Sequence, residues 1–135
     1  MNTLCQGEML IDTENDIVMA RKSVREAAVT LGFGVTDVTR IVTAASELTR
    51  NIYVYAGSGI MRWHSINDSN VGLELVFEDK GPGIIDVKLA MEPGYSTGKG
   101  LGMGLPGTKR LMDEMDVLSE IGKGTTIRIR KWLRQ

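Results

Sequence analysis

The chain has little cysteine, no long apolar run and almost no net charge. Its one cysteine, Cys5, excludes an internal disulfide and fits a reducing cytosol. No apolar stretch approaches the roughly 18 residues needed to cross a bilayer, and the N-terminus lacks the basic start and apolar run of a signal peptide. A net charge of -1 gives no electrostatic case for nucleic acid or an anionic membrane as the main partner. We therefore expect a cytoplasmic protein that binds neither.

The composition is typical of a soluble globular protein, with 42% hydrophobic and 24% charged residues. The length of 135 residues is enough for a sizeable core, and no repeat, low-complexity tract or linker divides the chain. We predict one domain over residues 1–135. Its pairing into a homodimer is left open.

Hydrophobic periodicity and turn residues predict the order β-α-α-β-β-loop-α-β-β. The first helix is capped by Thr13 or Asn15, and Pro106 suits the first turn of the last helix. Because strands that follow one another have short links, we expect an α/β chain of the α+β two-layer kind. Its sheet is mixed but mostly antiparallel, with the helices on one face. The predicted elements are a strand at 4–11, helices at 14–32 and 36–56, strands at 59–66 and 71–79, a loop at 84–101, a helix from 106 to about 115, and strands at 117–121 and 125–133.

Glu47 and Asn51 are four residues apart on the second predicted helix, so they share one face, about a third of a turn from the apolar stripe. An amide oxygen is a hard ligand for Mg²⁺, and a carboxylate can take a proton from an attacking hydroxyl. The pair is therefore a candidate site for a magnesium nucleotide. A solvated helix face is the competing interpretation of the pair alone.

Asp79 continues the inward-facing apolar row of its predicted strand and therefore needs a polar partner. The exocyclic amino group of adenine donates where a carboxylate accepts, whereas guanine presents an acceptor there. Gly81 and Gly83 follow directly and let the backbone turn sharply and approach a flat base. An ordinary turn after a strand is the alternative.

A glycine-rich run stands immediately before the last predicted helix, with glycines at alternate positions. Exposed backbone N–H groups and a helix N-terminus attract phosphate, and Lys99 adds a mobile charge. The run lacks the ending of a P-loop and follows no strand. Glycine alternation also suits a mobile lid that orders on ATP, and a flexible loop without a ligand is the alternative. The candidate residues are Gly98, Lys99, Gly100, Leu101, Gly102, Met103 and Gly104.

These patterns, Glu-x-x-x-Asn, Asp-x-Gly-x-Gly, Gly-x-Gly-x-Gly and a late Gly-Thr, resemble the N, G1, G2 and G3 boxes of the GHKL ATPase and kinase superfamily. They span residues 47–125, and the flanking elements match as well. The minimal length resembles the anti-sigma-factor kinases. Glu-Leu-Thr-Arg-Asn and Gly-Leu-Gly-Met-Gly-Leu-Pro-Gly-Thr-Lys-Arg-Leu-Met-Asp are similar to the RsbT-type switch kinases of the bacterial stressosome.

The resemblance implies the Bergerat fold, with ATP and Mg²⁺ held between sheet-end loops and a lid. It implies phosphorylation of a serine or threonine on a STAS-domain protein, followed by activation of a PP2C-type phosphatase. Carried over by position, Glu47 is the base, Asn51 the Mg²⁺ ligand and Asp79 the adenine partner. Gly81 and Gly83 shape the pocket. The glycine-rich run holds phosphates, Thr125 supports the adenine water network, and Arg50 contacts phosphate or a partner or lies on the surface.

Two other functions fit the same motifs. One is a nucleotide-gated adaptor or anti-sigma factor of the same fold, against which the retained Glu47 argues because a pure binder needs no base. The other is an ATPase or histidine-kinase fragment, which is disfavoured by the lack of a dimerisation helix. A basic edge late in the chain is either a solvated strand face or a docking surface, and comprises Arg128, Arg130, Lys131 and Arg134.

Overall fold

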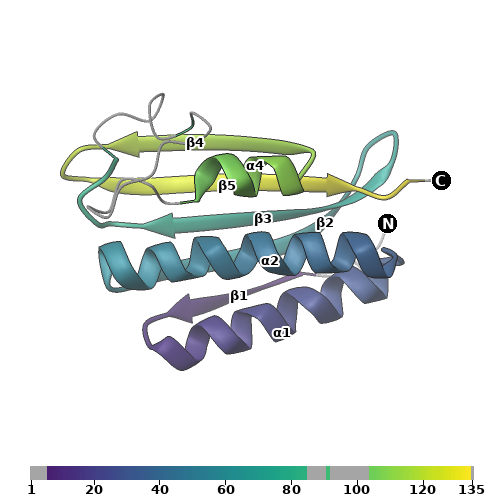
Figure 1. Ribbon diagram of the computed structural model, residues 1–135, viewed down its shortest axis with the longest axis horizontal. Coiled ribbons are helices and arrows are strands. Elements are labelled where there is room, and N and C mark those ends of the chain that lie inside the picture. Colours follow the sequence, from purple (N-terminus) through teal and green to yellow (C-terminus); the bar gives the residue numbers. More distant parts are fainter. Residues whose placement is uncertain (1–5, 85–90, 92–103, 135) are drawn as a thin grey trace.

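The computed structural model describes residues 6–84, 91 and 104–134. One sheet is covered by helices on one face (Figure 1), as the sequence predicts for an α+β two-layer sandwich. No helix in the described part of the chain is long and apolar enough to span a membrane. In chain order the elements are β1 (Gln6–Ile11), α1 (Glu14–Leu31), α2 (Val35–Asn51), the π-helix η1 (Ile52–Ala56), β2 (Gly59–Asn67), β3 (Val71–Asp79), α4 (Leu105–Leu111), β4 (Glu114–Glu120) and β5 (Gly124–Trp132).

The five described strands lie in the order β1-β2-β3-β5-β4. We expected a mixed sheet, but all four pairings between these strands are antiparallel. The short links from β2 to β3 and from β4 to β5 make these two pairs antiparallel. In the sheet, β5 lies between β3 and β4. The register places Asp79 opposite Thr125 and Ser119 opposite Thr125 on its other side. Three neighbouring strands therefore contribute to one end of the sheet.

The core lies between the sheet and the α1–α2 pair. Apolar side chains at helical spacing on α2, such as Ile41 and Leu48, meet strand residues such as Leu75 and Ile129, all essentially inaccessible to solvent. Of the two cap residues that the sequence offers, Thr13 caps α1, in a capping box with Asp16 that satisfies backbone N–H groups at that end. This packing fixes the C-terminal end of α2 beside the end of β3.

The other face of the sheet carries a network of charged residues. Glu74 is 7% exposed and accepts from Arg130 at 2.6 Å, with Arg128 at 3.4 Å and His64 at 3.0 Å. The basic edge predicted from the sequence is therefore divided between two faces. Lys131 lies on the helix side, 6% exposed, and donates to the carbonyl of Leu111 at 3.0 Å.

The predicted end of the last helix is wrong, and the second predicted helix ends at Gly57 as expected but changes its type before that end. The last helix ends at Leu111 rather than near Met115, because Met112 is extended and the Asp113 N–H already donates to the Arg130 carbonyl. Met115 belongs to β4, opposite Ile129. The second helix is regular only to Asn51, and residues 52–56 form a π-helical turn that ends at Gly57, with φ +86°. The predicted lid at residues 98–103 lies outside the described residues.

Candidate functional site

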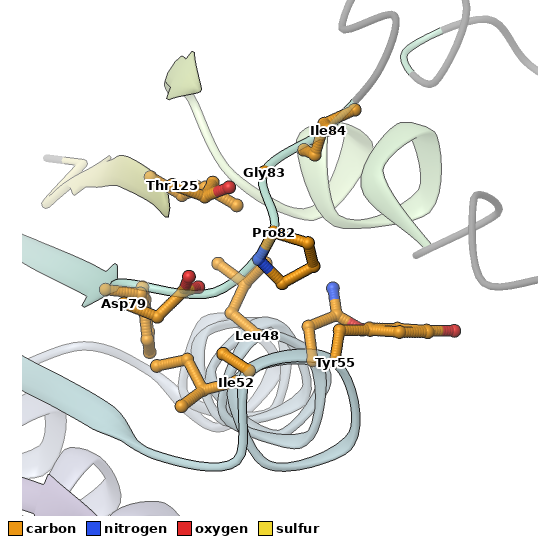
Figure 2. A pocket seen from close by; sticks show the side chains of 12 residues that line it. Leu48, Ile52, Tyr55, Asp79, Pro82, Gly83, Ile84 and Thr125 are labelled. Atoms are coloured by element: carbon orange, nitrogen blue, oxygen red, sulfur yellow. The ribbon is translucent and has the colours of Figure 1, made fainter. Parts of the chain in front are cut away.

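A pocket lies where the C-terminal end of α2 meets the ends of β3 and β5 (Figure 2). Its walls are mostly apolar, as in pockets that hold an aromatic ring, and are interrupted by the polar groups of Asn51, Tyr55, Asp79 and Thr125. Figure 2 shows Asp79 and Thr125 on one side of the pocket and Tyr55 on the opposite side. The lining comprises Leu48, Asn51, Ile52, Tyr55, Ala56, Phe77, Asp79, Pro82, Gly83, Ile84, Thr125 and Ile127.

Asp79 is the last residue of β3, and its half-buried carboxylate lines the pocket. Its Oδ1 accepts the backbone N–H of Gly81 at 2.8 Å. Burial raises the pKa of Asp79 above its ordinary value, while the N–H groups of Gly81 and Thr125 act in the opposite direction. A carboxylate can accept about four hydrogen bonds, so this one can still accept from a ligand's amino group.

The glycines after Asp79 allow backbone approaches that no side chain permits. A Cβ on Gly81 would lie 2.7 Å from the Ala56 Cβ, so this residue lets the strand end lie against η1. Gly83 has φ +82°, and a Cβ there would lie 2.5 Å from the carbonyl oxygen of Glu120. Gly83 itself lines the pocket, whereas Gly81 lies behind the wall and shapes it. The two glycines are therefore required by steric fit.

Glu47 and Asn51 share one side of the α2 C-terminus, as predicted, and both side chains are partly exposed. Asn51 lines the pocket. Glu47 lies against the beginning of α4, where a Cβ on Gly104 would be 2.7 Å from the Glu47 Oε2. The structure thus brings Glu47 beside the last residue of the glycine-rich run.

Arg50 does not join this group. It is exposed and lines a separate shallow groove between α1 and α2, together with Glu14, Asn15, Ile17, Val18 and Arg21. This placement favours the surface or partner interpretation of Arg50 over contact with the pocket. Six further predicted site residues lie outside the described residues, namely Gly98, Lys99, Gly100, Leu101, Gly102 and Met103.

A hydroxyl pair supports the pocket from behind. The Oγ of Ser119 lies 2.8 Å from the Thr125 Oγ1 and accepts the backbone N–H of Ile84 at 2.7 Å. The Gly122 N–H also donates to the Pro82 carbonyl at 2.9 Å. These bonds hold the chain that leaves β3 against the β4–β5 hairpin.

The sequence interpretation did not identify Tyr55 or Ser119. Tyr55 belongs to the π-helical turn, where the spacing of a regular helix no longer says which way a side chain points. Ser119 had no signal either, because a serine in an alternating strand resembles many solvent-facing serines. Its role depends on a contact with Ile84, 35 residues away in sequence.

Comparisons with known proteins agree with the fold described above. A family model described as a histidine kinase-like ATPase domain matches residues 12–131. The serine/threonine-protein kinase RsbT of Bacillus subtilis is 54% identical over 96% of this chain and 98% of that protein. An anti-sigma F factor of Caldanaerobacter subterraneus is 32% identical over 98% of this chain and 95% of that protein.

Two solved structures share the fold. The RsbU and RsbW domains of a Mycobacterium tuberculosis protein superpose with a TM-score of 0.65 at 22% identity, over 97% of this chain and 33% of that one. A histidine kinase domain from a blue-light-activated kinase of Erythrobacter litoralis gives a TM-score of 0.51 at 24% identity, over 73% of this chain and 45% of that one.

Proposed function

The chain belongs to the histidine kinase-like ATPase domain family, and from that premise we propose that it is an ATP-dependent protein serine/threonine kinase that acts as a partner switch. The resemblance recognised in the sequence is confirmed by the family match and by the 54% identity to RsbT over nearly the whole of both chains. The anti-sigma F factor relatives belong to the same fold and fit a regulatory role.

The pocket suits the adenine of ATP. Its apolar walls, with Tyr55 at one side, can hold a flat ring, and the Asp79 carboxylate can accept from the exocyclic amino group. Guanine would place an acceptor against the same carboxylate, so Asp79 would also select the base. From Asp79 the pocket extends along α2 toward Asn51, and this direction leads the phosphates toward Glu47 and Gly104.

The residues present also fit a magnesium ion. The amide oxygen of Asn51, at the pocket edge, is a ligand that a hard cation binds, and water and phosphate oxygens would complete the coordination of Mg²⁺. When bound, Mg²⁺ would neutralise charge on the phosphates. Gly104 and the glycine-rich run before it would hold those phosphates through backbone N–H groups.

Glu47 would act as the general base. Its carboxylate would accept the proton of the acceptor hydroxyl while the new O–P bond forms and the bond between the γ-phosphorus and the leaving ADP breaks. The single observation that carries this proposal is the contact of Glu47 with the start of α4, directly after the glycine-rich run.

The proposed acceptor is a serine or threonine of a STAS-domain protein, and the later partner is a PP2C-type phosphatase that the kinase activates. Both come from the resemblance to RsbT-type switch kinases. The near-neutral net charge of -1 agrees with protein partners rather than nucleic acid. The exposed groove that contains Arg50 is available for such contacts.

Incubation with radiolabelled ATP and candidate STAS proteins tests the function. We expect Glu47→Ala to abolish transfer while the ATP dissociation constant stays within about twofold, because the pocket is intact. Glu26→Ala is the control, since Glu26 is an exposed acid on α1 away from the pocket. Normal transfer by Glu47→Ala would remove Glu47 as the base.

A nucleotide-gated adaptor is the second candidate, which the anti-sigma F factor relatives favour. Such a protein would bind its partner only with ATP and would transfer no phosphate. Wild-type protein that captures a partner with ATP, yet labels none of the candidates, would support the adaptor over the kinase.

A further inference from the structure

Ser119 makes three polar contacts from one hydroxyl, although it stands outside the pocket lining. Its Oγ accepts the N–H of Ile84 at 2.7 Å, lies 3.2 Å from the Gly124 carbonyl oxygen and 2.8 Å from the Thr125 Oγ1. Thr125 is 9% exposed and lines the pocket beside Asp79. Ser119 is therefore a direct neighbour of a pocket hydroxyl.

The proton count limits what this pair can do. A serine hydroxyl has one proton and two lone pairs, and one lone pair is used by the Ile84 N–H. If the Ser119 proton goes to the Gly124 carbonyl, Thr125 must donate to Ser119 and offers the pocket only lone pairs. If the Ser119 proton goes to Thr125, the Thr125 proton is free to enter the pocket.

The two arrangements suit different bases. Beside the amino group that Asp79 would bind, adenine has a ring nitrogen that accepts a hydrogen bond, whereas guanine has an N–H that donates. Only the arrangement in which Ser119 donates to Thr125 makes Thr125 a donor. The 2.8 Å oxygen–oxygen distance is typical of a good hydroxyl–hydroxyl bond in either direction.

We propose that Ser119 is a positioning residue for base recognition, which donates to Thr125 so that the Thr125 hydroxyl donates, directly or through one water, to the acceptor ring nitrogen of adenine. The inference rests on the proposed function, because it takes the pocket to be the ATP site. In this arrangement the Ile84 N–H holds the Ser119 oxygen in place, and the Ser119 proton occupies a lone pair of Thr125, which leaves the Thr125 proton for the pocket.

Binding of ATP and of 1-deaza-ATP, in which a C–H replaces that ring nitrogen, tests the proposal. The measured quantity is the preference for ATP, which is the dissociation constant of 1-deaza-ATP divided by that of ATP. A general disturbance of the pocket weakens both nucleotides and leaves this ratio unchanged, whereas loss of the directed proton affects ATP alone. We expect Ser119→Ala and Thr125→Val each to lower the preference for ATP about fivefold, as for one neutral hydrogen bond.

Further variants isolate the path from Ser119 to the base. Ser119→Thr keeps a hydroxyl and should retain the preference within about twofold, while Ser119→Cys has similar size but bonds weakly and should resemble Ser119→Ala. In Thr125→Val protein, adding Ser119→Ala should lower the ratio no further. Ser65→Ala on β2 is the matched control, because no side-chain hydrogen bond of Ser65 occurs among the described residues.

Equal weakening of both nucleotides by Ser119→Ala would overturn the proposal, because Ser119 would then only hold Ile84. Additive effects of Ser119→Ala and Thr125→Val on the ratio would also overturn it. Wild-type protein that binds neither nucleotide would instead overturn the proposed function itself.

Discussion

Gly104 is the position where a single methyl group should separate the catalytic geometry from the fold. It stands at the N-cap of α4 with φ +69°, in the left-handed region that costs a residue with a Cβ about 1 kcal/mol. An added Cβ would lie 2.7 Å from the Glu47 Oε2 and 2.8 Å from its Cδ, closer than real Cβ contacts. The carboxylate is the flexible partner, so Glu47 is the group that must move.

We therefore expect Gly104→Ala to lose about 1 kcal/mol of unfolding free energy and roughly 3–5 °C of melting temperature. Phosphate transfer should fall much more, by about 100-fold in kcat, because displacement of a catalytic group by about 1 Å costs a factor of that order. Transfer from radiolabelled ATP to the acceptor and a thermal melt measure the two effects separately.

Gly107→Ala is the matched control in the same helix. A Cβ on Gly107 meets nothing within 4 Å, and its φ is not positive, so alanine should stabilise the helix by about 1 kcal/mol and leave transfer unchanged. Gly104→Ala protein that melts lower but transfers at the wild-type rate would show that the start of α4 does not fix Glu47. That result would refute the argument from this contact.

Three further predictions concern stability and pH. Because burial raises the pKa of Asp79 above 3.8, the folded state holds this proton more tightly than the unfolded chain does. The contribution of Asp79 to stability should therefore fall as the pH rises from 3.8 through the raised pKa. In urea titrations across that range, the free energy of unfolding of the wild type should fall relative to that of Asp79→Asn, and a relative rise would contradict the argument. Lys131→Met should cost about 2 kcal/mol of unfolding free energy in the same assay, because the ammonium group donates to the Leu111 carbonyl and lies 3.7 Å from the carboxylates of Asp37 and Asp113. A loss below about 0.5 kcal/mol would mean that the two carboxylates are stabilised well enough by their other partners. Gly32→Ala should cost about 1 kcal/mol at φ +99° in the same urea titrations, whereas Gly107→Ala, which has open space and no positive φ, should not destabilise the protein.

Much of the architecture followed from local signals. The capping box at Thr13, the apolar stripe of α2 and the alternation of β3 are each set by neighbours in sequence, so those elements were predicted correctly. The last helix was extended too far because Met112 and Met115 are three residues apart, a spacing that fits a helix. Pairing with β5 ends the helix earlier, because the Asp113 N–H donates to the Arg130 carbonyl instead of continuing the helix.

The antiparallel sheet and the division of the basic residues depend on contacts distant in sequence. Lys131 lies next to Arg130 in sequence but on the other side of the sheet, where Asp37 and Asp113 surround it. Alternation along a strand could have separated these two residues. Their acidic partners could not have been identified from the sequence, because Asp37, which pairs with Lys131, belongs to α2, and Glu74, which pairs with Arg130, belongs to β3.

The pocket shows most clearly where sequence reasoning stops. Its polar residues stood out because acids and glycines are unusual at a strand end, but its apolar wall is indistinguishable in sequence from core. The π-helical turn at 52–56 contains the wall residues that the periodicity of a regular helix would misplace. Ile52 belongs to the core stripe, so a regular helix would direct residues 55 and 56 toward the core as well. The wider turn, closed by the Gly57 N–H on the Ile52 carbonyl at 2.9 Å, instead leaves Tyr55 and Ala56 lining the pocket. The π-helical turn therefore contributes Tyr55 to the side of the pocket opposite Asp79, where a flat base would be held.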